Sequence, residues 1–139
     1  MTVNRTLCRG RSRLLARKRR RGPRHWPVLG EAEVFWLFTV RPDGRPHATP
    51  LLAAWSLGGV CFTTGGQERK ARNLEHNPRC VLTTGTNALT GVDVVIEGVA
   101  SVVGERSERE QAVADFERKY GTHLTAPGVA CCSAKRERM

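Results

Sequence analysis

Apolar residues along this chain gather in short runs that turn-forming residues separate, a pattern typical of a small β protein. VFWLFTV, residues 34–40, is a continuous apolar and aromatic run, which predicts a strand buried on both faces. Asp43-Gly44 follows in a turn sequence, and residues 47–57 form a second run. Pro50 interrupts this second run. Because proline cannot donate to a sheet ladder, Pro50 predicts an edge strand or a bulge.

The next segments alternate between strand and helix patterns. Gly58-Gly59 predicts a tight turn, and residues 60–64 predict a third strand. A short helix is expected over residues 67–76, and Asn77-Pro78 is expected to end it. Residues 92–103 show a period of two, with apolar residues or glycine at every even position. One face of this strand should pack on a core while the other meets polar surroundings.

Two more elements complete the predicted order. Residues 81–84 predict a strand, and the capping box Ser107–Glu110 predicts the start of a helix that Gly121 ends. The apolar stripe of this helix is Ala112, Val113, Phe116 and Tyr120. Five strands with mostly short links, in the order β-β-β-α-β-β-α, favour a small antiparallel barrel over a doubly wound α/β sheet. The expected fold class is therefore mainly β, a β-barrel with flanking helices.

The net charge of +10 belongs to the beginning of the chain. Residues 1–30 hold ten basic residues and no acidic one, whereas residues 31–139 hold 13 of each. Dense like charge and few large apolar groups predict disorder over residues 1–27. Such an arm could bind RNA, DNA or an anionic surface, but a solvated tail, or translation from a start codon placed too far upstream, is the favoured interpretation. No nucleic-acid partner is expected for the neutral body.

Cysteine usage and hydropathy bear on the compartment. There are five cysteines, an odd number, and no CxxC pair, so neither a zinc site nor a disulfide framework is indicated. Cys61 and Cys80 lie inside apolar runs and are predicted to be small buried hydrophobes. No stretch has the apolar length that spans a bilayer, and no apolar run follows the basic start as it does in a secretory signal. We therefore expect a cytoplasmic protein without a membrane partner.

Templates for catalysis by side chains are missing. The sequence contains no GxSxG motif, no Walker A loop and no GxGxxG fingerprint. The four histidines are scattered, and no pair of carboxylates falls on one predicted face. No catalytic residue and no metal ligand are therefore assigned.

The junction TTGGQERKARN, residues 63–73, is the segment with the most chemistry. Its hydroxyls end a strand, and its glycines let a ligand approach the backbone. Arg69 and Lys70 stand where the next helix begins, and the helix dipole opposes each of them by about 0.3–1 kcal/mol. A bound phosphate would reverse the sign of that cost, because free N–H groups and cations both favour an anion.

Helical spacing extends this junction by one turn. Asn73 lies four residues after Arg69 and three after Lys70, so the three are predicted to share a face. Glu68 and Arg72 are likewise spaced for an ion pair across one turn. A polar surface turn with solvated cations would give the same spacing, so spacing alone leaves the two interpretations equal.

Three segments in order, WLFTVRPDGRPHATPLLAAW, VCFTTGGQERKARNLEHNPRCVL and GVDVVIEGVASVV, resemble the pyridoxamine 5′-phosphate oxidase-like family of split-barrel flavin-binding proteins. The resemblance covers about residues 31–121 and looks closest to a branch of flavin and deazaflavin users. It implies a six-stranded split barrel and a homodimer, with the flavin at the dimer interface outside the barrel. The expected cofactor is FMN, with the 8-hydroxy-5-deazaflavin coenzyme as the alternative.

The same resemblance implies the site residues. The family's phosphate-binding pair falls on Arg69 and Lys70, and its strand-end contacts fall on Thr63 and Thr64. The strand along the isoalloxazine ring falls on residues 47–54, and a late polar contact falls near Asp93. With the spacing argument added, the expected cofactor-binding set is Thr49, Pro50, Thr63, Thr64, Arg69, Lys70, Asn73 and Asp93.

The expected function is a flavin-binding oxidoreductase that transfers hydride or electrons between FMN and an unidentified small substrate. The alternatives are a deazaflavin-dependent reductase, a non-catalytic flavin-binding protein and a nucleic-acid binder acting through residues 1–27. The expected organisation is a basic arm at 1–30, a split-barrel domain at 31–121 and an irregular tail at 122–139. Both ends depart from the family pattern, so we expect a barrel without its last strand and a frameshift or misplaced start in the gene.

Overall fold

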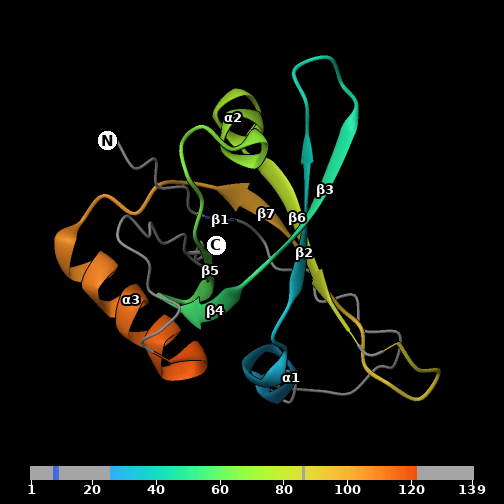
Figure 1. The fold of residues 1–139 in the computed structure, drawn as a ribbon, viewed down its shortest axis with the longest axis vertical. Coiled ribbons are helices and arrows are strands. Elements are labelled where there is room, and N and C mark those ends of the chain that lie inside the picture. Colours follow the sequence, from blue (N-terminus) through green and yellow to red (C-terminus); the bar gives the residue numbers. More distant parts are fainter. Residues whose placement is uncertain (1–7, 10–25, 86, 122–139) are drawn as a thin grey trace, which may run out of the picture.

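The structure is a computed structural model that describes residues 8–9, 26–85 and 87–121. It consists of antiparallel strands in two sheets, with helices packed around them (Figure 1). The elements are β1 (Cys8–Arg9), α1 (Trp26–Glu31), β2 (Phe35–Val40), β3 (Pro46–Leu51), β4 (Ala53–Ser56), β5 (Gly59–Phe62), α2 (Arg69–His76), β6 (Arg79–Thr84), β7 (Val94–Ala100) and α3 (Arg106–Tyr120).

The larger sheet has the strand order β1-β7-β6-β2-β3, and the smaller one pairs β4 with β5. The segment predicted as one strand over residues 47–57 is two strands, because the chain leaves the first sheet at Leu52 and enters the second at Ala53. Pro50 lies in β3, which is at the edge of the larger sheet, so the predicted edge position is confirmed. The fold class, mainly β with flanking helices, agrees with the prediction. Within the described residues the two sheets do not close into a barrel.

The core lies between the two sheets. It joins Phe35 and Leu37 of β2 to side chains from β4, β5, β6 and β7, and it includes Cys80, while Cys61 is buried in a second cluster under α3. Both cysteines are therefore buried, as predicted. The inward positions of β7 are Val94, Ile96, Gly98 and Ala100, which confirms the period-two pattern over the strand itself.

The outward side chains of β2 correct one prediction. Trp36 and Phe38 are 48% and 40% exposed, so residues 34–40 are not buried on both faces. The reason is that β4, β5 and the helices cover only the inner face of this sheet within one chain. The outer face of a strand with a continuous apolar sequence is thus left bare.

Both hairpin turns use positive φ angles, but the second one is displaced from its predicted place. Gly44 has φ 87° in the predicted Asp43-Gly44 turn. In the second turn, Leu57 and Gly58 have φ 54° and 77°, while Gly59 pairs with Ser56 as the first residue of β5. Leu57 packs against the buried Cys61 cluster, which offsets the strain that a side chain meets in this conformation.

The helix ends also differ from the prediction in detail. Helix α2 ends before Asn77, as expected, but it starts at Arg69, two residues after the predicted start. Glu68 pairs with Lys70 rather than with Arg72. Helix α3 starts at Arg106, one residue before Ser107, so the predicted capping box does not form. Its apolar stripe is confirmed, since Ala112 and Phe116 are buried and the other two members are half-buried.

The last turn of α3 fastens this helix to the sheets. The ammonium of Lys119 donates to the carbonyl oxygens of Leu29, at 3.0 Å, and Ala53, at 2.8 Å. The Tyr120 hydroxyl accepts from the Ala53 N–H at 3.1 Å and lies 2.8 Å from the Glu33 and Ala53 oxygens, to which it donates in turn. These contacts join the end of α3 to α1, to the residues before β2 and to β4.

The predicted disordered arm is only partly described. Cys8–Arg9 pairs with β7, and α1 begins at Trp26, so these residues differ from the expected disorder. The rest of the arm and the tail at 122–139 lie outside the described residues. Over the described part of the chain, no helix is both long enough and apolar enough to cross a membrane.

Candidate functional site

Helix α2 is held against the end of the larger sheet by a buried polar contact. The Asn73 amide donates to the Thr39 hydroxyl of β2 at 3.0 Å, and Ala71 and Leu74 are buried beside it. This contact brings the first turn of α2 to the end of β2 that leads into the β2–β3 hairpin (Figure 1). Residues far apart in the sequence therefore meet here.

Four basic side chains gather at this place: Arg41, His47, Arg69 and Lys70. Burial is the main cause that lowers the pKa of His47, and the positive charges of the other three lower this pKa further. The three cations are thus each close enough to His47 to act on it electrostatically. We refer to these four residues as the basic cluster.

His47 enters the basic cluster through strand register. His47 of β3 pairs with Thr39 of β2, one residue pair away from the turn that carries Arg41. Its Nδ1 atom is buried and has no hydrogen-bond partner in this structure. Because its pKa is lowered from a value already below 7, the ring is neutral at physiological pH. A neutral imidazole with an unsatisfied nitrogen beside three cations fits the approach of an anionic or hydroxyl-bearing ligand.

Lys70 is the most enclosed cation of the cluster. Its side chain is 12% exposed, and burial lowers its pKa. Its partner is the carboxylate of Glu68, which directly precedes α2. Arg69 is exposed. Both cations occupy the first two positions of α2, so the predicted conflict with the helix dipole is present in the structure.

The two threonines lie in the loop that leads into α2. Thr63 and Thr64 follow directly after β5, and Thr64 is 4% exposed. The Thr64 hydroxyl donates to the Gly65 carbonyl oxygen at 3.2 Å. Its proton is thereby engaged, and the oxygen keeps its capacity to accept. The half-buried Thr63 lies beside it.

The remaining predicted residues divide between two ends of the sheet. Thr49 is two residues from His47 on the same face of β3, whereas Pro50 points to the opposite face, beside Trp36. Asp93 precedes β7 and lies against Gly85, at the end of β6 and β7 away from α2. One chain therefore does not bring Asp93 to the basic cluster.

Asn73 also differs from its predicted position. It is fully buried, while Arg69 is exposed, so the shared polar face expected for Arg69, Lys70 and Asn73 is not formed. Its amide nitrogen donates a hydrogen bond to the Thr39 hydroxyl, and its Oδ1 atom is buried without a hydrogen-bond partner in this structure. Asn73 fixes the position of α2, which in turn positions the two cations.

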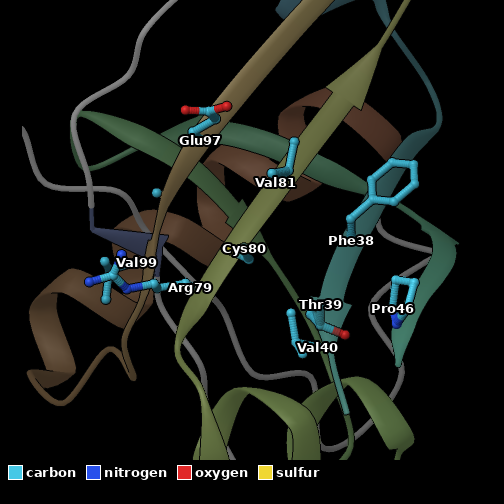
Figure 2. A pocket seen from close by; sticks show the side chains of 10 residues that line it. Phe38, Thr39, Val40, Pro46, Arg79, Cys80, Val81, Glu97 and Val99 are labelled. Atoms are coloured by element: carbon cyan, nitrogen blue, oxygen red, sulfur yellow. The ribbon is translucent and has the colours of Figure 1, made fainter. Parts of the chain in front are cut away.

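A groove of about 460 Å³ lies on the outer face of the sheet, at the same end as α2. Figure 2 shows its side chains, which come from β2, β3, β6 and β7. Apolar groups such as Phe38, Val81 and Val99 form most of the lining, with Arg79 and Glu97 as charged members. This groove and the basic cluster are on opposite faces of one sheet, because His47 faces inward and Phe38 faces outward.

The family model of pyridoxamine 5′-phosphate oxidase matches residues 23–137, well over half of the chain. The chain belongs to the pyridoxamine 5′-phosphate oxidase family. A relative from Rubrobacter xylanophilus, described as pyridoxine/pyridoxamine 5′-phosphate oxidase, is 37% identical over 99 residues. This stretch is 70% of the chain and 44% of the relative, so the chain spans less than half of that protein.

Solved structures similar to this family member agree on the fold. HutZ from Vibrio cholerae, described as a heme storage protein, matches with TM-score 0.67 at 22% identity, over 81% of this chain and 87% of that one. A putative pyridoxamine 5′-phosphate oxidase from Listeria innocua matches with TM-score 0.61 at 19% identity, over 76% and 84%. At such identities the likeness establishes the split-barrel fold, which these structures share with the chain.

The family match is longer than the resemblance found in the sequence. That resemblance was placed on about residues 31–121, whereas the match starts at residue 23 and continues to residue 137. The segment after Gly121 is therefore part of the family match, which corrects the expectation that the family pattern stops there.

Sequence reasoning missed three members of the site: Arg41, His47 and Glu68. A signal existed for two of them, because the Asp43-Gly44 turn fixes a register that sets His47 opposite Thr39 and leaves Arg41 at the strand end. The role of Glu68 had no such signal, since helical spacing favoured Arg72 as its partner.

Proposed function

We propose that this member of the pyridoxamine 5′-phosphate oxidase family is a flavin-binding oxidoreductase that transfers hydride or electrons between FMN and an unidentified small substrate. The observation that carries the proposal is the convergence of Arg41, His47, Arg69 and Lys70 at the start of α2. Four basic groups without a matching number of acids form a site for an anion of more than one charge. The phosphate of FMN is such an anion.

The residues fit this group in chemistry and in placement. Arg69 offers a planar fork that binds two phosphate oxygens at once, and Lys70 offers a point charge. The first turn of α2 also has free N–H groups, and the helix dipole favours negative charge there. A phosphate would turn the unfavourable position of both cations into a favourable one.

His47 would respond to the bound anion. A phosphate beside the ring favours the imidazolium form, so it raises a pKa that burial and three cations now hold low. His47 would then take up a proton and donate through the nitrogen that lacks a partner in this structure. Phosphate affinity should consequently increase as pH falls toward 6, until the phosphate itself is protonated.

Strand β3 would orient the rest of the cofactor. It lies at the edge of the larger sheet, so the backbone groups on its open side have no strand neighbour among the described residues. From His47, the strand leads through Thr49 toward Ala53 and Ala54, the segment on which the family resemblance sets the isoalloxazine ring. When bound, the flavin supplies the redox chemistry, while this chain binds and orients it.

We also propose that the protein is a homodimer. The outer sheet face exposes three large apolar side chains, Trp36 and Phe38 of β2 and Val99 of β7, with β6 between the two strands. A second copy would cover this face and remove these side chains from water. Light scattering during gel filtration tests this: we expect twice the mass of the chain, and a monomer at 100 µM would contradict it.

The test of FMN binding uses a ligand pair that differs only in the phosphate. Wild-type protein is titrated with FMN and with riboflavin in a calorimeter, and the ratio of the two affinities measures the phosphate contribution. We expect Arg69→Ala combined with Lys70→Ala to reduce this ratio by about tenfold to a hundredfold, as charge-assisted contacts are lost. The matched control is Arg72→Ala on the same helix, whose side chain donates to Gln67 at 2.6 Å.

Four outcomes would count against the proposal. Equal affinity of the wild type for FMN and riboflavin would mean that the basic cluster holds no flavin phosphate. Preferential binding of hemin would assign the protein to another cofactor. Binding of an 8-hydroxy-5-deazaflavin coenzyme in place of FMN would support the reductase alternative on the same scaffold, and tight FMN binding without turnover would leave a flavin carrier.

A further inference from the structure

The carboxylate of Glu68 lies where an anionic ligand of the basic cluster would bind. Its Oε1 atom accepts a hydrogen bond from the Gly65 N–H at 2.9 Å, and its Oε2 atom pairs with the Lys70 ammonium. A backbone N–H of a glycine loop and an ammonium at a helix start are donors that phosphate also uses. The chain thus supplies its own anion to part of the site.

This position of Glu68 is not that of an ordinary helix cap. Glu68 is the residue before α2, but its side chain makes no capping bond to the helix. Instead it turns back to Gly65, whose carbonyl oxygen accepts from the Glu68 N–H at 3.0 Å. A Cβ atom on residue 65 would lie 3.2 Å from Oε1, so a glycine gives the carboxylate its close approach.

The carboxylate is also free to leave. The Glu68 side chain is 50% exposed, whereas its partner Lys70 is 12% exposed. Moving Glu68 into water would therefore expose an enclosed cation and one loop N–H to an incoming ligand. The half-exposed carboxylate gains hydration when it leaves, and the incoming anion takes its place beside the enclosed Lys70, so that no enclosed charge is left without a partner.

We infer that Glu68 is a built-in competitor for the phosphate site, which a ligand must displace from Gly65 and Lys70 before it binds fully. The inference deepens the proposed function and rests on it for the identity of the ligand. A dianionic phosphate, which gains from all members of the basic cluster, displaces the carboxylate more readily than a singly charged anion does. Glu68 thereby sets the strength with which the site binds an anion.

Glu68→Gln is the variant that separates the charge from the shape. Its amide oxygen keeps the acceptor for the Gly65 N–H, while the negative charge beside Lys70 is removed. The matched control is Glu105→Gln, because Glu105 also precedes a helix, has extended backbone angles and makes no side-chain cap bond. Full-length wild type and both variants are titrated with inorganic phosphate, FMN and acetate.

For Glu68→Gln we expect affinity for inorganic phosphate and FMN to increase about tenfold, as a like charge a few ångströms from the ligand is removed. Acetate affinity should also increase, but by a smaller factor, because the removed charge repels a monoanion less than a dianion. Glu105→Gln should leave all three affinities unchanged. Thermal unfolding of each protein confirms that the compared samples are folded.

The outcomes separate this inference from the proposed function. Phosphate binding in Glu68→Gln could be unchanged or weaker while the wild type still binds FMN. This result would overturn the inference that Glu68 competes with the ligand and would leave the flavin proposal intact. Tighter phosphate binding in the variant, with FMN bound by neither protein, would support the competitor and overturn the flavin. If none of the proteins binds inorganic phosphate or FMN, both are wrong.

Discussion

Two lysines of this chain are partly buried beside helix ends, and they are held in opposite ways. Lys119 lies in the last turn of α3, where the dipole favours a cation, and its ammonium donates to two carbonyl oxygens. It also lies 4.8 Å from the ring centre of Phe35 and 5.0 Å from that of Tyr120. Lys70 lies in the first turn of α2, where the dipole opposes it, and its partner is a half-exposed carboxylate.

The difference indicates what each lysine is for. All contacts of Lys119 come from the backbone or from packed rings, so they persist as long as the fold does. The contact of Lys70 comes from a side chain that can turn into water, so it can be exchanged for a ligand. A partly buried cation such as Lys119, whose contacts come from the fold itself, stabilises the fold. A partly buried cation such as Lys70, whose partner is an exchangeable side chain, marks a binding site.

The largest expected effect tests the first half of this comparison. Lys119→Met should lower the free energy of unfolding by about 2 kcal/mol, since two charged hydrogen bonds and two ring contacts are lost while a desolvation cost is removed. Chemical denaturation measures this. Arg118→Met is the control, because Arg118 is 73% exposed and pairs with Asp115, so its loss should stay below about 1 kcal/mol. Equal losses of unfolding free energy in both variants would mean that Lys119 stabilises the fold no more than an exposed cation does.

A smaller effect is expected at the other lysine. Lys70→Met should weaken FMN binding about tenfold, which corresponds to about 1.4 kcal/mol, while the unfolding free energy changes by less than about 1 kcal/mol. Calorimetric titration and denaturation of the same sample give both numbers. Lys119→Met, measured below its melting temperature, should retain FMN affinity. A Lys70 variant that is mainly destabilised would show that this lysine, too, is structural.

The smallest effect is a dependence of stability on pH. Burial lowers the pKa of Lys119 to about 8, against about 10.4 for an unfolded lysine. Between these values the unfolded state binds more protons, so wild-type stability should rise with pH from 8 to 10. We expect the free energy of unfolding to increase by about 1 kcal/mol over this range. This is less than the whole shift in the pKa of Lys119 implies, because the ammonium stays in partial contact with water.

Lys119→Met isolates this contribution. The difference in unfolding free energy between wild type and variant should grow with pH over the same window and stay constant below pH 7. A difference that is flat from pH 8 to 10 would mean that water reaches Lys119 freely in the folded protein.

The sequence allowed the order of the elements to be predicted, because period-two patterns and turn residues act locally. It predicted a strand over residues 92–103, of which Val94–Ala100 form β7, and a helix over residues 67–76, of which Arg69–His76 form α2. It also predicted the edge position of Pro50. It did not predict the bare outer face of β2. A run that is apolar at every position looks the same whether its second face meets its own chain or another molecule.

The site was predictable only in its local part. Arg69 and Lys70 follow from the conflict between cations and the helix dipole, and the structure places them at the first two positions of α2. His47 and Arg41 reach them through the contact between Asn73 and Thr39, which joins residues 34 positions apart. Contacts of that range have no signature in spacing, and for the same reason Asn73 was assigned to the ligand rather than to the core.

The bare outer face of β2 has a consequence for every measurement proposed above. If a second copy covers Trp36 and Phe38 and the dimer binds the cofactor more tightly than the single chain does, cofactor and partner bind cooperatively, and each must strengthen the other by the same factor. Dilution would then weaken the apparent affinity for FMN without any change in the residues that contact it, and added FMN would hold dilute protein together. The apparent affinity for FMN would therefore depend on the protein concentration as well as on the sequence.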